Sequence, residues 1–210
     1  MFYPSFLRWA RAAVFVPFVL GAVPGLADQT AAVGAPDATT LAQKLPEKLL
    51  AAIHRAPDRF VTSTADEIAS YGTAGGLGPD GIERLIASDR ARLRARAAER
   101  ILRADLDNDG SVSRPEMDNL IAISAEGARG RAETDWRAAD ADQNGTASPA
   151  EIKGFAEARA LSGLSDEDAA GYRAYMMMDA NGDGLLTLDE VTAAVDALGR
   201  IKAEAVKKAL

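Results

Sequence analysis

The chain contains no cysteine, only one histidine among its 210 residues, and few aromatic residues (6%). Without cysteine it cannot form disulfides, a thiolate zinc site or a cysteine nucleophile. The single histidine disfavours His-rich metal sites and most histidine-dependent catalysis. Basic residues are outnumbered, with 24 Lys and Arg against 31 Asp and Glu. The resulting net charge of −7 disfavours nucleic-acid binding, because phosphate contacts need clustered Lys and Arg.

Residues 1–27 have the pattern of a secretory signal peptide. Two arginines precede an apolar run at 12–23, and small residues lead up to Ala27. The alternative, a transmembrane anchor, is disfavoured because a spanning helix needs about 20 apolar residues and because Pro17 interrupts the run. We therefore expect an exported protein, periplasmic or extracellular, whose mature chain has no stable membrane span.

The rest of the chain is predicted to be a linker followed by helices. Residues 28–44 are rich in Ala, Thr, Gly and Pro and lack periodicity, which predicts a flexible linker. Residues 45–94 carry apolar residues at helical spacing, and a Gly-rich loop at 72–81 precedes a long helix that starts near Asp80. No segment after the signal alternates with period two over a useful length. The predicted fold class is therefore all-α, with minimal strand.

Three twelve-residue segments repeat at intervals of 35 and 39 residues, and each fits D-x-[DN]-x-[DN]-G-x5-E. Positions 1, 3 and 5 of such a loop supply carboxylate or amide oxygens, position 7 a backbone carbonyl and position 12 a two-oxygen carboxylate. The glycine at position 6 permits the sharp turn. Ca²⁺ binds about six to eight such oxygens, so the pattern predicts up to three calcium ions. The predicted ligands are Asp105, Asp107, Asp109, Ser111 and Glu116 in loop one; Asp140, Asp142, Asn144, Thr146 and Glu151 in loop two; and Asp179, Asn181, Asp183, Leu185 and Glu190 in loop three.

The flanks of the loops repeat as well. A Ser or Thr stands three residues before each closing Glu, which predicts a capping box and an exit helix that begins inside the loop. A large apolar residue lies four positions before each loop: Ile101, Trp136 and Tyr175. These are the apolar faces of a helix–loop–helix unit.

This arrangement resembles the EF-hand superfamily, with calmodulin-like spacing and an export signal of bacterial type. The resemblance covers about half the chain and implies hands at 95–126 and 130–161, and a third at 166–210 that includes a C-terminal helical tail. Three hands are an unusual number, because EF-hands generally pair. Residues 60–68, inside the helical region 45–94, look like the back half of a degenerate loop without metal. Two pairings are open: this degenerate loop with loop one and loops two and three together, or loops one and two together with loop three alone.

The three loops are not equivalent. Among their predicted ligands, loop one has four formal negative charges, whereas loops two and three have three each. The residue at position 8, which joins the bridge between paired loops, is smallest in loop two, where it is Ala147. We therefore predict that loop two binds calcium most weakly. Titrations of single Glu→Gln variants test this ranking, and equal or tighter binding at loop two would contradict it.

The function expected from these features is calcium binding in an exported Ca²⁺-dependent interaction or sensor module, with a protein or peptide partner held in apolar clefts. The alternative is a constitutively loaded calcium buffer or a Ca²⁺-stabilised structural protein. A lanthanide-binding EF-hand protein is less favoured, because position 2 of each loop lacks proline. No catalytic set stands out, so we expect no enzyme. The G-x-G-x-x-G motif at 76–81 follows no strand, which indicates a loop before a helix, not a dinucleotide site.

Overall fold

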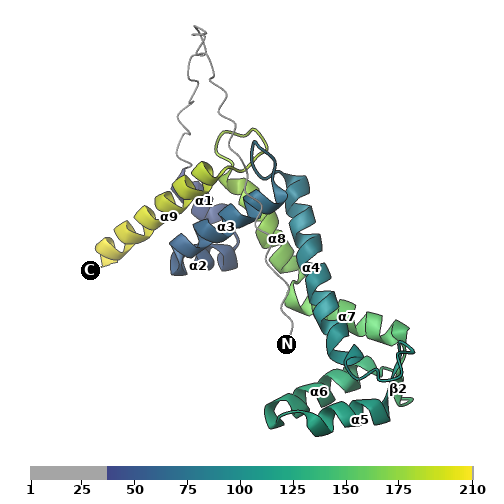
Figure 1. The fold of residues 1–210 in the computed structure, drawn as a ribbon. Helices are drawn as coiled ribbons and strands as arrows, with labels where there is room; N and C mark the ends of the chain where they lie inside the picture. The colour runs from purple at the N-terminus through teal and green to yellow at the C-terminus, as the bar shows by residue number, and fades with distance from the viewer. Residues whose placement is uncertain (1–36, 210) are drawn as a thin grey trace, which may run out of the picture. The chain divides into compact units, whose positions relative to one another are not determined.

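The computed structural model describes residues 37–209, which are mainly helical, as predicted (Figure 1). In chain order the elements are α1 (Ala38–Lys44), α2 (Glu47–Arg55), α3 (Pro57–Tyr71), α4 (Pro79–Leu102), β1 (Val112–Ser113), α5 (Arg114–Ile123), α6 (Glu126–Ala139), β2 (Thr146–Ala147), α7 (Pro149–Gly163), α8 (Asp166–Arg173), the 3₁₀ helix η1 (Ala174–Met178) and α9 (Leu188–Ala209). The predicted signal peptide and the first part of the predicted linker lie outside the described residues. Within the described part of the chain, no helix is long and apolar enough to cross a membrane.

Helix α1 corrects the linker prediction, because residues 38–44 are helical. Asp37 caps this helix: its carboxylate accepts hydrogen bonds from the Thr39 backbone N–H (3.1 Å) and the Thr40 hydroxyl (2.5 Å). A seven-residue helix is too short to be stable alone. It is stabilised by burial of Leu41 and Leu45 where α1 contacts α9, a tertiary contact that leaves no periodic signal in the sequence.

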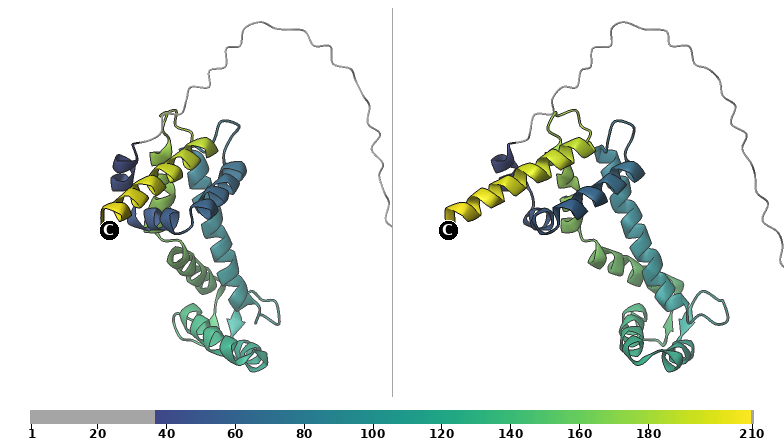
Figure 2. Two further views of the ribbon diagram at one scale, coloured as in Figure 1. Left: turned by 90° about the vertical axis from the view of Figure 1, so that its left-hand side faces the viewer. Right: turned by 60° about the vertical axis from the view of Figure 1, so that its left-hand side comes forward.

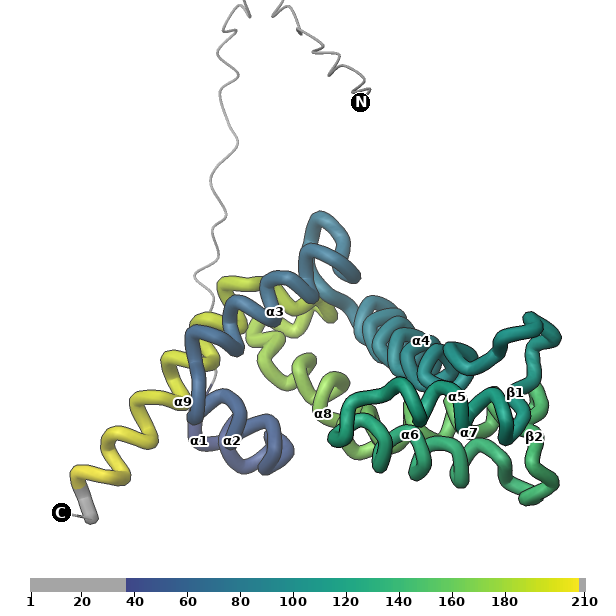
Figure 3. The backbone as a smooth tube through the Cα atoms, turned by 60° about the horizontal axis from the view of Figure 1, so that its bottom comes forward, coloured from purple at the N-terminus to yellow at the C-terminus, as the bar shows by residue number. Residues whose placement is uncertain are grey.

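Loops one and two pair with each other. Strands β1 and β2 form a two-stranded antiparallel sheet (Figure 3). In this sheet Val112 lies opposite Ala147. Both side chains are fully buried in a core cluster that includes Ile101, Trp136 and Phe155. This cluster lies among α4, α5, α6 and α7, so the second of the two open pairings is correct for these loops.

Loop three is not alone, however. Leu186, at position 8 of loop three, forms an isolated antiparallel bridge with Leu77 of the Gly-rich loop between α3 and α4. The two backbone N–H groups each donate to the other residue's carbonyl oxygen at 2.9 Å. Both side chains are fully buried in a second core cluster. The pairing is therefore nested: the loop one–loop two pair lies, in sequence, between the two partners of the outer pair.

The prediction of a degenerate loop at residues 60–68 is wrong, because these residues lie inside α3. Phe60 and Thr64 are buried four residues apart on one face of that helix, and Pro57 occupies its first turn. The loop that pairs with loop three is instead the glycine-rich segment between α3 and α4. Helix α4 begins at Pro79, which agrees with the prediction that the G-x-G-x-x-G motif marks a loop before a helix. This partner has no acidic residue between Tyr71 and Pro79, so it pairs without offering metal ligands.

Helix α4 connects the two core clusters. Its N-terminal half contributes Ile82, Leu85 and Ile86 to the second core cluster, around Leu77 and Leu186, which we call the outer cluster. Its C-terminal half contributes Ala97 and Ile101 to the cluster beneath β1 and β2, which we call the inner cluster. The same helix therefore leaves the glycine-rich loop and enters loop one. It packs along α7 and also contacts α8, and Figure 2 shows it running between the two sets of helices.

A half-buried carboxylate in the outer cluster predicts a pH dependence. Burial raises the pKa of Glu67 from 4.5 to about 7; the Tyr175 hydroxyl opposes this shift, whereas the Asp89 and Asp66 carboxylates add to it. One carboxylate oxygen of Glu67 is buried and has no hydrogen-bond partner. The folded state therefore holds a proton that the unfolded chain has released, so this residue's contribution to stability is full below pH 4.5 and is lost as pH rises to about 7.

We expect Glu67→Gln to remove this loss, making the variant more stable than the parent above pH 7 by about 1–2 kcal/mol after allowance for solvent screening. The measurement is the free energy of unfolding by urea at pH 5 and pH 8 in calcium-containing buffer. Glu204→Gln is the control, because Glu204 is an exposed glutamate on α9 and is not among the groups that shift the pKa of Glu67. A Glu67→Gln variant whose stability parallels that of the parent at both pH values would contradict the assignment.

Candidate metal centres

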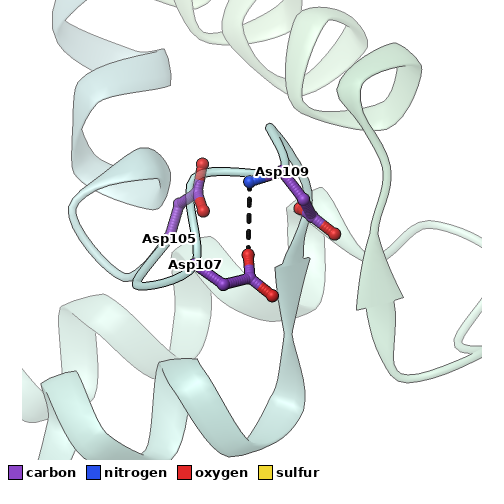
Figure 4. A group of neighbouring side chains, drawn as sticks. All are labelled: Asp105, Asp107 and Asp109. Atoms are coloured by element: carbon purple, nitrogen blue, oxygen red, sulfur yellow. Dashed lines mark hydrogen bonds between the residues drawn. The ribbon is translucent and has the colours of Figure 1, made fainter.

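Loop one brings three carboxylates together. Ligand oxygens of Asp105, Asp107 and Asp109 all lie within 4.8 Å of one another (Figure 4). Each carboxylate is held by backbone N–H groups of the loop itself. The Gly110 N–H donates to Asp105 (3.1 Å), the Asp109 N–H to Asp107 (3.2 Å), and the Ser111 N–H to Asp109 (2.7 Å). These bonds curl the loop so that its acidic side chains converge.

Loop two gathers a different set of carboxylates. Asp140, Asp142 and Glu151 each place an oxygen within 4.8 Å of the others. Asp140 is buried, and its Oδ2 accepts from the Gly145 N–H at 3.1 Å. Its Oδ1 is also buried but has no hydrogen-bond partner. A buried anionic oxygen without a partner is costly, and a cation would remove that cost.

Loop three has the same hydrogen bond from the position 6 glycine to the first aspartate, but its side chains are arranged and buried differently. The Gly184 N–H donates to Asp179 at 2.9 Å, as in the other two loops. Here Asp179, Asp183 and Glu190 do not form a cluster of three carboxylates as close as those of loops one and two. The side-chain amide of Asn181 instead donates to Asp183 at 3.0 Å. Glu190 is fully buried, whereas Glu116 and Glu151 are only partly buried.

The closing glutamates occupy equivalent positions in all three loops. One carboxylate oxygen accepts from the backbone N–H at position 2, and the other from the backbone N–H and hydroxyl at position 9. In loop one these donors are Leu106 (2.9 Å) and Ser113 (2.8 and 2.7 Å). The predicted capping boxes are therefore present, and α5, α7 and α9 begin at position 10 of the three loops.

In loops one and two these hydrogen bonds favour the ionised form of the closing carboxylate. The backbone N–H and hydroxyl of Ser113, together with the Leu106 N–H, lower the pKa of Glu116 to about 2. The hydroxyl and backbone N–H of Ser148 also lower the pKa of Glu151. At neutral pH both side chains are negative, which is the form that binds a cation.

Position 4 of each loop is a feature that the sequence pattern did not identify. Its residue has a left-handed backbone conformation in every loop, with φ of 61° at Asn108, 60° at Gln143 and 72° at Gly182. Asn and Gly adopt this conformation readily, whereas Gln does so at a cost. The Asn108 N–H donates to Asp105 at 2.7 Å and the Gly182 N–H to Asp179 at 2.8 Å. The position 4 N–H therefore contacts the first aspartate in loops one and three, whereas in loop two the Oδ1 of Asp140 has no hydrogen-bond partner.

The residues present fit a hard divalent cation. The predicted donors are carboxylate, side-chain amide and backbone carbonyl oxygens, with no nitrogen or sulfur ligand among the predicted positions, which suits Ca²⁺. The unpartnered Asp140 Oδ1 and the close carboxylates of loops one and two indicate where positive charge would be accommodated. Of the predicted ligands, Glu116 does not belong to the close carboxylate group of loop one. The position 7 residues Ser111, Thr146 and Leu185 were predicted through their backbone carbonyls, and that role stays a prediction.

Comparison with known proteins identifies the first of these units. Residues 100–121 match the family model described as EF hand. This segment is similar to an EF-hand. It contains the end of α4, all of loop one and most of α5, which agrees with the resemblance predicted from the sequence. The EF-hand match supports calcium binding. No curated protein and no solved structure matches the chain.

Proposed function

We propose that the chain is an exported calcium-binding protein with three EF-hand loops, and that the loop one–loop two pair acts as a Ca²⁺-dependent interaction module. The observation that carries this proposal is the repeated loop geometry. In all three loops the first aspartate accepts from the position 6 glycine N–H, at 3.1, 3.1 and 2.9 Å. A common backbone geometry supports a common ligand, even though the family match covers only the first loop.

An apolar cleft beside loop one supports the interaction role. It lies between α4 and α7 and has a volume of about 400 Å³. Its lining includes Ala98, Leu102, Ile152 and Ala156, and Leu102 is 40% exposed. Leu106 and Ile123 of the same hand are more exposed still. Apolar groups at the surface of a cleft favour a protein or peptide partner.

A structural role is favoured for loop three by a specific observation. Its closing residue, Glu190, is fully buried, and Leu186 joins loop three to the core of the outer helices. The Glu190 carboxylate accepts hydrogen bonds from the Ala180 and Thr187 N–H groups, and a bound cation would stabilise an acidic group further in such a buried place. We infer that calcium at loop three compensates this charge, so that this site is occupied constitutively.

Export is a separate part of the proposal and rests on residues 1–27 of the sequence. Calcium outside the cytosol is often abundant, so affinities of about 10⁻⁴–10⁻³ M are sufficient there. Amino-terminal sequencing of the protein recovered from outside the cytoplasm tests this part. A mature chain that begins at Asp28 is expected, and recovery of the protein only inside the cell with Met1 retained would contradict it. The proposal includes no catalytic activity.

Calcium removal tests the proposed function directly. We expect isothermal titration to give three Ca²⁺ per chain, and EDTA to lower the melting temperature. Each site contributes about 2.7 kcal/mol when free calcium is 100 times its Kd. The matched control carries Glu116→Gln, Glu151→Gln and Glu190→Gln together, which retains side-chain size while removing one charge per loop. If the parent protein takes up no calcium at millimolar concentration, or melts identically in EDTA, the proposal fails.

Calcium-dependent fluorescence of a hydrophobic dye distinguishes an interaction module from a calcium buffer or a structural protein. An interaction module exposes apolar surface when calcium binds, so dye fluorescence is expected to rise with calcium in the parent and in Glu190→Gln. The rise should be absent in Glu116→Gln. A buffer or purely structural protein would show no rise in any of the three proteins.

A further inference from the structure

Three arginines from three different helices line one cleft in the part of the molecule that carries the loop one–loop two pair. Arg100 belongs to α4, Arg131 to α6 and Arg159 to α7, and these helices contact one another. The cleft has a volume of about 540 Å³, and Gly130, Thr134 and Asp135 complete its lining. It shares no residue with the three loops. The three loops present negatively charged carboxylates, whereas this cleft presents the positively charged N–H donors of arginine.

Two of the arginines are held in place by a buried carboxylate. Asp135 is only 5% exposed; its Oδ2 accepts from the Nε of Arg100 at 2.7 Å and its Oδ1 from an Nη of Arg159 at 2.8 Å. Both guanidinium groups also stand over the ring of Phe155, at 6.0 and 5.3 Å from its centre. Contacts on two sides fix these side chains before any ligand arrives, which reduces the entropy lost on binding.

The cleft retains positive charge and free donors. One Asp135 carboxylate balances one of the two guanidinium groups, and Arg131 adds a third cation. Within the described part of the chain, Arg131 forms no ion pair. A guanidinium has five N–H donors, and the short bonds to Asp135 use one from Arg100 and one from Arg159. Planar donors converging from several directions suit an oxyanion with several acceptor oxygens.

We propose that this cleft binds a tetrahedral oxyanion, a phosphate or sulfate group, between Arg131 and the Asp135-anchored pair Arg100 and Arg159. The inference does not depend on calcium binding. The shared chemistry is the oxyanion itself, which is either free in solution or carried as a monoester on a larger molecule. Two other clefts carry no comparable cluster of arginines. The cleft beside loop one is mainly apolar, and the cleft between α3 and α9 contains one arginine and two aspartates.

The test is a titration of the full-length mature protein followed by the Nε–Hε signals of Arg100 and Arg159 in nitrogen–proton correlation spectra. Sulfate is used in calcium-containing buffer. Inorganic phosphate and phosphoserine are used in calcium-free buffer, because calcium would precipitate phosphate. We expect saturable shifts in the millimolar range, and about tenfold weaker binding in Arg131→Gln, which removes charge-assisted hydrogen bonds. Tighter binding of phosphoserine than of phosphate would identify the monoester as the preferred form.

The matched control is Arg94→Gln, an exposed arginine on α4 that lines the cleft beside loop one. Like Arg131→Gln it removes one exposed positive charge, but from α4 and outside the lining of the proposed site, so its affinity for all three anions should equal that of the parent. Arg131 is exposed, so its replacement should leave the circular dichroism spectrum and the calcium titration unchanged. Shifts that stay linear with anion concentration, or equal weakening in Arg94→Gln and Arg131→Gln, would overturn the proposal.

Discussion

Glu116→Gln is expected to weaken calcium binding at loop two as well as at loop one, while loop three is unaffected. Gln offers one ligand oxygen where Glu offers two, and it carries no charge, so the affinity of loop one should fall at least about tenfold. Loop two is affected through β1 and β2, where Val112 faces Ala147 and the Arg114 N–H donates to the Gly145 carbonyl at 2.9 Å. A coupling free energy of about 1–3 kcal/mol is typical between linked sites.

The backbone amide signals of the three position 6 glycines report the three loops separately. Each N–H donates to the first aspartate of its own loop, so Gly110, Gly145 and Gly184 are expected to shift as their loops fill. In Glu116→Gln, the Gly110 and Gly145 signals should need more calcium, and the Gly184 signal should titrate as in the parent.

The reciprocal variant is the control for this coupling. Glu190→Gln should weaken only the Gly184 transition, because loop three pairs with Leu77 and not with another acidic loop. An unchanged Gly145 transition in Glu116→Gln, or a Gly184 transition that moves with it, would show that the sites are not coupled as the sheet pairing implies.

Gly76→Ala is expected to destabilise the fold by about 2–4 kcal/mol. Gly76 has a φ of 134°, a conformation that residues with a Cβ rarely adopt. A Cβ at this position would lie 2.7 Å from the carbonyl oxygen of Leu186, a backbone atom that cannot move without breaking the bridge to Leu77. Thermal and urea unfolding in calcium-containing buffer measure this loss, and the calcium affinity of loop three should fall with it.

Gly182→Asn provides the matched control for this prediction. Gly182 also has a positive φ of 72°, but a Cβ there would meet nothing within 4 Å. The equivalent positions of loops one and two already carry Asn108 and Gln143 in the same conformation. This variant should be within about 0.5–1 kcal/mol of the parent. Equal destabilisation by the two substitutions would mean that backbone conformation alone, and not the close approach to Leu186, explains the effect of Gly76→Ala.

The loops were predictable because everything that shapes them lies within twelve consecutive residues. The first aspartate accepts from the position 6 glycine five residues later, and the closing glutamate accepts from positions 2 and 9 of the same loop. The exit helices were equally predictable, since the capping boxes of Ser148 and Glu151 and their equivalents act over three residues. The burial of Ile101 and Trp136 followed from helical periodicity for the same reason.

The partner of loop three was not predictable from the sequence. The glycine-rich loop has none of the acidic residues by which the other loops were found, and it contributes a single bridge residue, Leu77, through its backbone. Helix α1 was missed for a related reason, because its stability comes from burying Leu41 and Leu45 after the chain has folded. The arginines around Asp135 lie in three helices, and no spacing in the sequence shows that they meet.

The sequence by itself determined the three acidic loops, their exit helices and the mainly helical class of the protein, because local hydrogen bonds and helical periodicity act between near neighbours. Only the tertiary structure decided that loops one and two pair, that loop three pairs with the glycine-rich loop, and that Arg100, Arg131 and Arg159 share a cleft. Backbone bridges and helix packing join residues far apart in the chain, and they depend on shape and on N–H and C=O groups that every residue carries.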